Sequence, residues 1–310
     1  MKRLLLHIFI FTLVLAAINL CAINSNASRF NFKTETTSRF YQKDTLKGKI
    51  LIEKDIIIEN YFQFIDSIVN KYDALTPYKL SEHLLVRANA WIIDTLQNTD
   101  YYRRIAKDSF VYNQKKMIAL PKGSMLIVPN SEVAHEIQNS FKNTLIDINI
   151  PEFKLRVYEA DKLLYEFPIR VGRDEKKYLE MSERIQDLKT KTGKGRIINH
   201  FRNPRYVNPV NNHEYIVTKR DDEKVTKLPQ IPFIETEING IRNGQLIHPT
   251  TNAATLGKAY SNGCIGTNEG DAWVIYYHAP LETKVHIRYD LNVINDKGDR
   301  IVLKDIYNKY

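Results

Sequence analysis

A cysteine and a histidine sixteen residues apart are the side chains of this sequence best suited to nucleophilic chemistry. Cys264 lies in the run Ser261-Asn262-Gly263-Cys264-Ile265-Gly266, and His248 precedes it. A free thiol is only about a few per cent thiolate at neutral pH, so a nucleophile needs a base or a lowered pKa. His248 ends the strand-like run Gln245-Leu246-Ile247, which would hold its imidazole rigidly. The hypothesis is therefore Cys264 as nucleophile with His248 as general acid/base, and its alternative on the residues alone is a buried thiol beside an unrelated histidine.

The chain has 2 cysteines, and the other one lies in an apparent export signal. Lys2 and Arg3 give a positive start, Leu4 to Leu20 is almost unbroken apolar sequence, and Ser25-Asn26-Ala27 offers small residues for cleavage. Removal of residues 1–27 would take Cys21 away and leave Cys264 with no partner for an internal disulfide. A lone exported thiol is a liability unless it has a use, which favours the nucleophile.

The signal predicts an exported protein of the periplasm or cell wall. Two other interpretations are a retained signal anchor and a lipoprotein modified at Cys21. The second fits poorly, because Ile18-Asn19-Leu20 lacks the small residues wanted before such a cysteine. No other stretch is long and apolar enough to span a bilayer.

Charge and composition restrict the partners only broadly. The formal net charge is +9, and +7 without Lys2 and Arg3, which suits an anionic cell envelope as well as simple solubility. The charges are scattered and no helix-turn-helix, zinc-finger or RNA-binding signature is present, so we expect no nucleic-acid partner. His200, His213 and His248 do not share metal-ligand spacing, and we predict no metal and no cofactor.

The elements that would position the pair form a mainly β domain over residues 150–290. Phe153, Leu155 and Val157 alternate with polar residues, Asp161-Lys162 can turn the chain, and Leu163 to Val171 alternate again up to Gly172. Further short strands are expected at 195–199, 215–218, 245–248 and 284–289. One helix fits after the cysteine, with Asn268 as its N-cap and its positive end favouring a thiolate.

The remaining segments are expected to be accessory. Residues 28–60 are polar at first and carry no period, which predicts a linker. Residues 61–145 carry helical apolar spacing, as at Tyr61, Ile65, Ile68 and Tyr72, and predict a helical domain that packs on the catalytic one. Residues 291–310 predict a small hairpin tail. The fold class is therefore α+β, with a small, largely helical domain before a mainly β one.

Residues 153 to about 289 resemble the catalytic domain of the YkuD-type L,D-transpeptidases. That family carries a histidine, a gap of about fourteen to seventeen residues, and then Ser-His-Gly-Cys with an aliphatic residue, as Ser261 to Ile265 nearly do here. Upstream, the hairpin ending at Val171-Gly172, the block Thr190 to Gly195 and the loop Asn203 to Tyr206 follow the family order. Part of 61–145 also resembles a degenerate LysM module, at Leu84 to Asn89 and Pro121 to Pro129.

Four positions depart from the family pattern. Asn262 replaces histidine, Gly266 stands where arginine or asparagine is usual, Pro249 follows the catalytic histidine in place of glycine or serine, and Lys191 replaces a proline. The first two lie beside the substrate path of the family and put acceptor choice in doubt. Pro249 is tolerable, because in the family its carbonyl orients the imidazole and proline keeps its carbonyl.

The resemblance implies an enzyme that acts on peptidoglycan stem peptides through a Cys264 thioester and forms 3→3 cross-links without cofactor or metal. Water as acceptor would instead make it an L,D-carboxypeptidase. The candidate oxyanion and substrate-binding residues are Gly263, Ser261, Asn262, Pro249 and Tyr260. A sortase-like transpeptidase and a non-catalytic wall-binding protein are the rival interpretations, and no protein partner is predicted.

Overall fold

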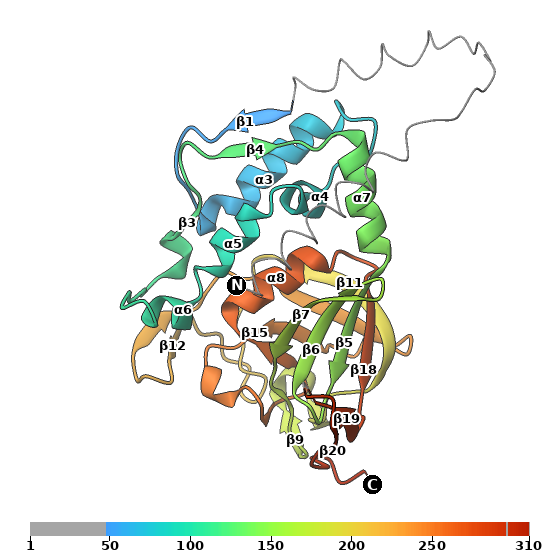
Figure 1. Ribbon diagram of the computed structural model, residues 1–310. Helices are drawn as coiled ribbons and strands as arrows, with labels where there is room; N and C mark the ends of the chain where they lie inside the picture. Colours follow the sequence, from blue (N-terminus) through green and yellow to red (C-terminus); the bar gives the residue numbers. More distant parts are fainter. Residues whose placement is uncertain (1–47, 296, 310) are drawn as a thin grey trace, which may run out of the picture. The chain divides into compact units, whose positions relative to one another are not determined.

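The computed structural model describes residues 48–295 and 297–309 (Figure 1). The predicted signal peptide, Cys21 and the first part of the predicted linker lie outside these residues. Within them, no helix has the length and apolar character needed to cross a membrane.

An eight-stranded sheet forms the main part of the sheet region, which we define as residues 143–289. Its strands lie in the order β17-β15-β14-β11-β18-β5-β6-β7. Their bounds are Ile265–Thr267, Leu246–Pro249, Phe233–Ile238, Gly193–Phe201, Lys284–Arg288, Thr144–Asn149, Lys154–Glu159 and Lys162–Pro168. Pairing is antiparallel except between β15 and β17 and between β18 and β5. The mainly β, α+β class predicted from the sequence is confirmed.

The predicted hairpin is present as β6 and β7, but three strands of the sheet, β5, β14 and β17, were not predicted. β5 begins at Thr144, so the domain boundary placed at 150 is wrong and the sheet region starts within the stretch assigned to the helical domain. β5 pairs with both β6 and β18 and is almost wholly buried. Ile146, Ile148 and Ile150 alternate with Asp147 and Asn149, so the strand signal was present and was missed. β14 likewise alternates isoleucine or threonine with Glu235 and Glu237.

The two outer strands of the sheet approach each other at one point. Arg170, just after β7, bridges to Gly266 in β17, with Arg170 N to Gly266 O at 2.8 Å and Gly266 N to Arg170 O at 3.0 Å. β8 (Val171–Gly172) then pairs in parallel with β16 (Ala259–Ser261). The sheet is therefore nearly closed, and the closing point lies two residues from Cys264.

Two short strand pairs and two 3-10 turns lie in the connections between the strands of this sheet. They are the pairs β9 (Lys176–Leu179) with β10 (Arg184–Asp187) and β12 (Val217–Lys219) with β13 (Val225–Lys227), and the 3-10 turns η2 (Glu180–Ser182) and η3 (Ala253–Thr255). The helix predicted after the cysteine is α8 (Glu269–His278), and all of its residues are buried.

The helical region, residues 48–142, precedes the sheet region and contains short strands as well as helices. Its elements are β1 (Lys49–Leu51), β2 (Ile56–Ile57), α3 (Ile58–Asp73), α4 (Glu82–Arg87), α5 (Trp91–Gln97), α6 (Tyr101–Ile105), η1 (Gln114–Lys116), β3 (Ile118–Leu120), β4 (Met125–Ile127) and α7 (Ser131–Lys142). β1 pairs with β4 and β2 with β3, so the linker prediction is wrong from Lys49 to residue 60. The LysM likeness of this region stays a prediction.

The helical region shares a hydrophobic core with the sheet region through α8. α8 packs against α4 and α5 (Figure 1), and its Trp273 ring lies against Tyr61 and Phe62 of α3. Trp273, Tyr276 and Tyr277 are fully buried, and such large aromatic side chains contribute strongly to burial energy. The helical region is therefore part of the structure that supports the sheet.

The tail forms the predicted hairpin, β19 (Asn292–Ile294) with β20 (Arg300–Val302). Beyond it, Tyr307 is buried and reaches the sheet region, where its hydroxyl donates to Gly172 O at 2.6 Å and accepts from Thr190 N at 3.1 Å. The tail is thus joined to the segment behind Cys264, which the prediction of an appended hairpin did not include.

Candidate active site

The structure places Cys264 and His248 on neighbouring strands. His248 lies in β15 and Cys264 directly precedes β17, and in this parallel pair His248 is opposite Gly266. Side chains two residues apart on a strand project to the same face, so the positions of Cys264 and Gly266 share the face that carries the imidazole. Both the thiol and the imidazole residue are half-buried.

A backbone carbonyl fixes the orientation of the imidazole. His248 Nδ1 lies 2.9 Å from Pro249 O, and because a carbonyl only accepts, Nδ1 carries the proton. No described residue is hydrogen bonded to Nε2, which is left as an acceptor. The ring packs against Phe233 at 4.9 Å between centroids. The carbonyl expected of Pro249 is therefore in place, and burial lowers the pKa of His248 to about 4, with help from the charge of Arg170.

The thiol and the imidazole rest in their neutral forms. Burial raises the pKa of Cys264, while a backbone hydrogen bond at Leu246 and the charge of Arg170 lower it by less. At neutral pH the pair is thus a thiol beside a neutral base. A proton can pass from sulfur to Nε2 when an electrophile approaches, which is the arrangement that general-base activation requires.

The turn before Cys264 is held by its own side chains. The Ser261 hydroxyl donates to Cys264 O at 2.5 Å and accepts from Gly263 N at 3.2 Å. Gly263 has a φ of +108°, which a residue with a side chain rarely adopts. Thr190 Oγ1 donates to Gly263 O at 3.0 Å and accepts from Gly172 N at 2.8 Å. Ser261 thus shapes the turn. The backbone amide of Gly263, a candidate donor to an oxyanion, already donates to the Ser261 hydroxyl.

Asn262 and Tyr260 lie on the outer side of this turn. Asn262 Oδ1 accepts from Arg173 Nη2 at 2.7 Å, and the Arg173 guanidinium lies 6.0 Å from the ring of Tyr260. Tyr260 is 54% exposed. An amide here holds an arginine in place, and sequence reasoning did not anticipate that arginine.

A second unanticipated arginine lies nearer the pair. Arg170 Nη1 donates to Thr255 Oγ1 at 3.2 Å, and its Nε is buried. A Cβ added to Gly266 would lie 2.6 Å from that Nε, so the Arg170 side chain occupies the space that a residue at 266 would need. A one-dimensional motif cannot reveal this, because the two residues are 96 positions apart.

The N-terminus of α8 does not serve the thiolate as predicted. Its amide at Gly270 donates to Asp100 Oδ2 at 2.7 Å, and Glu269 forms a buried ion pair with Arg220 at 2.5 Å. Asn268 occupies the N-cap, but its side chain bonds Asp271 and not a backbone amide. This helix end is therefore used to join the helical region to the sheet region.

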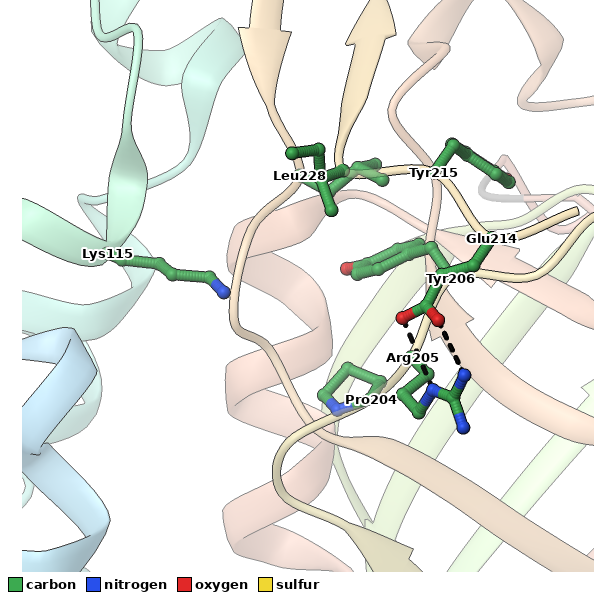
Figure 2. Close-up of a pocket in the computed structure, with 8 residues that line it drawn as sticks. Lys115, Pro204, Arg205, Tyr206, Glu214, Tyr215 and Leu228 are labelled. Carbon is green, nitrogen blue, oxygen red and sulfur yellow. Dashed lines mark hydrogen bonds and ion pairs between the residues drawn. The ribbon is translucent and has the colours of Figure 1, made fainter.

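A small pocket lies beside Tyr206, and none of the candidate site residues lines it. It has a volume of about 110 Å³, and Figure 2 shows its lining by Tyr206, Tyr215 and the Arg205–Glu214 ion pair. Tyr206 packs edge-on against Phe233 at 5.4 Å, and Phe233 packs against His248. Lys115 of the helical region also lines it. The ring of Phe233 thus lies between His248 and a pocket lined by aromatic rings and by charges of both signs.

The match to a known protein family concerns the sheet region. Residues 143–287 match the family model of the L,D-transpeptidase catalytic domain, YkuD. A sequence comparison with curated proteins finds no match.

Three similar solved structures illustrate the relation. They are an L,D-transpeptidase from Mycobacterium smegmatis (13% identity, TM-score 0.33, 47% of this chain and 58% of that chain), L,D-transpeptidase 3 from Mycobacterium tuberculosis in complex with a faropenem-derived adduct (13%, 0.30, 47% and 60%), and residues 123–326 of an L,D-transpeptidase from Xylanimonas cellulosilytica (10%, 0.35, 79% and 100%). The chain spans less than two thirds of the length of the two mycobacterial proteins. Residues 143–287 form a catalytic domain of the YkuD L,D-transpeptidase family.

Proposed function

We propose that this protein is an L,D-transpeptidase that forms 3→3 cross-links between peptidoglycan stem peptides, with Cys264 as nucleophile and His248 as general acid/base. The observation that carries the proposal is the imidazole, whose Nδ1 donates to Pro249 O and whose Nε2 stays free on the strand beside the thiol. The family of residues 143–287 supports the substrate class.

In the proposed first step, the Cys264 thiol passes its proton to His248 Nε2 as sulfur attacks the carbonyl carbon of the third stem residue. The C–N bond to the terminal D-alanine breaks, and that amine leaves with the proton from His248. The product is a thioester with no net charge on the pair. The side-chain amine of a second stem then attacks the thioester, gives a proton to His248, and releases the thiol.

We further propose that the protein is exported to the periplasm or cell wall. The support is the positive start at Lys2 and Arg3 followed by the apolar run to Leu20. The substrate class requires the same location, because peptidoglycan lies outside the cytoplasm.

The test is incubation of the purified protein with disaccharide-tetrapeptide and mass spectrometry of the products. Dimers joined 3→3, with release of D-alanine, are expected. Disaccharide-tripeptide alone would identify an L,D-carboxypeptidase with the same site. No product from folded protein, together with binding to wall sacculi, would favour the non-catalytic alternative. Cys264→Ala protein is the control for contaminating activity.

A further inference from the structure

Three residues on neighbouring strands form a row across the closing point of the sheet. Arg170 is bridged to Gly266, and Gly266 is opposite His248. Residues opposite each other in a sheet project their side chains to the same face. Cys264 lies two positions before Gly266, so its side-chain position shares that face. The centre of the row has no side chain, which leaves room between an arginine, a histidine and a thiol.

The side chain of Arg170 fills part of that room. A Cβ at position 266 would lie 2.6 Å from Arg170 Nε, 2.7 Å from Cγ and 3.0 Å from Cδ, all shorter than atoms tolerate. The guanidinium is held at one end by Thr255 Oγ1. Its Nε is buried and has no hydrogen-bond partner among the described residues. A buried donor without a partner costs stability. Eight other described side-chain atoms share this state, so it is the placement of the guanidinium across Gly266 that sets Arg170 apart.

We propose that Arg170 is a positioning residue of the active site, whose guanidinium, laid across Gly266, stabilises the thiolate of Cys264. This rests on the proposed function only in giving the thiolate its use. When the sulfur proton passes to His248 Nε2, negative charge appears on sulfur in a half-buried site. A fixed cation on the same face offsets that charge and needs no rearrangement.

The electrostatics agree with the geometry. The charge of Arg170 lowers the pKa of Cys264 and that of His248, and Cys264 in turn raises the pKa of Arg170 against the effect of burial. The other titratable groups that face the guanidinium are Tyr215, Tyr260 and Arg173. No described carboxylate forms an ion pair with Arg170, so its charge is not neutralised by the protein.

The test measures alkylation of Cys264 by iodoacetamide as a function of pH, which needs no peptidoglycan. In Arg170→Gln the midpoint of the profile is expected to move up by about one pH unit, with about tenfold slower labelling at pH 7. Arg170→Lys is expected to shift less. Gly266→Ala keeps the charge but displaces the side chain, so it is expected to shift the profile in the same direction. Arg196→Gln, a substitution in β11 at a side chain paired with Glu282, is the control and leaves the profile unchanged.

The outcomes separate this proposal from the proposed function. An unchanged pH profile of alkylation in folded Arg170→Gln would overturn the proposal for Arg170. A change in KM alone would also overturn it, because it would assign Arg170 to binding a substrate carboxylate. If Arg170→Gln does not fold, unchanged profiles in both Arg170→Lys and Gly266→Ala overturn it equally. A shifted profile in a protein that makes no cross-links would support Arg170 while refuting the transpeptidase. The double variant Arg170→Gln, Gly266→Arg places a guanidinium at the neighbouring position. Return of its alkylation pH profile toward that of wild type would support the role of a guanidinium beside Cys264.

Discussion

His248 and His200 lie in different parts of the sheet region and have nearly the same electrostatics. Burial is the main cause that lowers the pKa of each to about 4. Each ring gives one hydrogen bond to a backbone carbonyl, His248 to Pro249 O at 2.9 Å and His200 to Ala279 O at 3.0 Å. A perturbed pKa and a fixed ring orientation therefore do not distinguish a base from a structural histidine.

Their neighbours do distinguish them. His200 stacks on His83 at 5.0 Å and meets the ring of Tyr276 at 4.8 Å, where the helical region joins α8. Glu82, next to His83, bonds Tyr276, Tyr277 and Arg202, so the charges beside His200 are paired with each other. His248 shares a face of the sheet with a thiol, a glycine and an arginine that forms no ion pair with a described carboxylate. The comparison teaches that a nucleophile and an unpaired cation beside the ring distinguish the candidate base from a structural histidine.

Cys264→Ala is the substitution with the largest expected effect on the site around His248. Turnover is expected to fall by more than about a thousandfold, because the described chain has no second thiol to replace a covalent nucleophile. The melting temperature should change little, since the thiol is half-buried and the turn is held by Ser261, Gly263 and Thr190. Product formation by mass spectrometry and thermal unfolding measure the two effects. Residual turnover above about a thousandth of wild type would remove Cys264 from the nucleophile role.

Matched substitutions at the two histidines give the next largest effect. His248→Gln is expected to lower kcat by about 10²–10⁴-fold, the range for loss of a general base, with a loss of stability like that of His200→Gln, because each loses a carbonyl bond and a ring contact. His200→Gln is expected to lower the free energy of unfolding by about 1–3 kcal/mol through the lost carbonyl bond and ring stack, while kcat per folded molecule is kept.

Urea unfolding gives the folded fraction of both variants, and steady-state kinetics then check the difference in kcat per folded molecule. Equal losses of activity in the two variants would show that the helical region controls the site as strongly as the base does. Unchanged activity in His248→Gln would transfer the base role to another group.

The sequence predicted the candidate pair but not the residues that surround it. Cys264, His248 and the Pro249 carbonyl were accessible because they are close in the chain and carry a motif. Arg170 and Arg173 were not, because only the pairing of β17 with the segment after β7 brings them beside the turn. β5 was missed although Ile146, Ile148 and Ile150 alternate with polar residues, because this short run directly follows the helical spacing of Val133, Ile137 and Phe141. Tyr307 was missed because a single buried residue after a hairpin leaves no periodic signal.

Acid should destabilise the protein through the structural histidines. The unfolded chain takes up protons below its usual histidine pKa of about 6.5, whereas His200 in the folded state does so only near 4. Folding stability is therefore present above pH 6.5 and is lost as the pH falls toward 4. Between pH 7 and pH 5 we expect a loss on the order of 1 kcal/mol from His200, after allowance for solvent screening.

Urea unfolding at several pH values measures this loss, and His200→Gln should reduce it, while His83, His248 and His278, whose pKa values are also lowered, keep their share. Burial raises the pKa of Glu82, which has the opposite sign, so the difference between the two proteins isolates the histidine. Identical pH dependence in wild type and His200→Gln would show that other groups carry the acid sensitivity.

Two tyrosine hydroxyls, one at the junction with the helical region and one behind the turn of Cys264, test the difference between the two regions with the smallest expected effects. Tyr61 OH lies 2.6 Å from Tyr277 OH at the junction with the helical region, and Tyr307 OH bonds Gly172 O and Thr190 N. Phenylalanine at either position should cost about 1 kcal/mol of stability, the usual net value of a hydrogen bond. Only Tyr307→Phe should also reduce kcat, by a few-fold, since Thr190 holds the carbonyl of Gly263 next to the nucleophile. Both variants are measured at equal folded fraction. Equal kcat in Tyr61→Phe and Tyr307→Phe would show that the turn before Cys264 keeps its shape without the hydroxyl of Tyr307, and that residues beyond Thr190 do not affect the reaction.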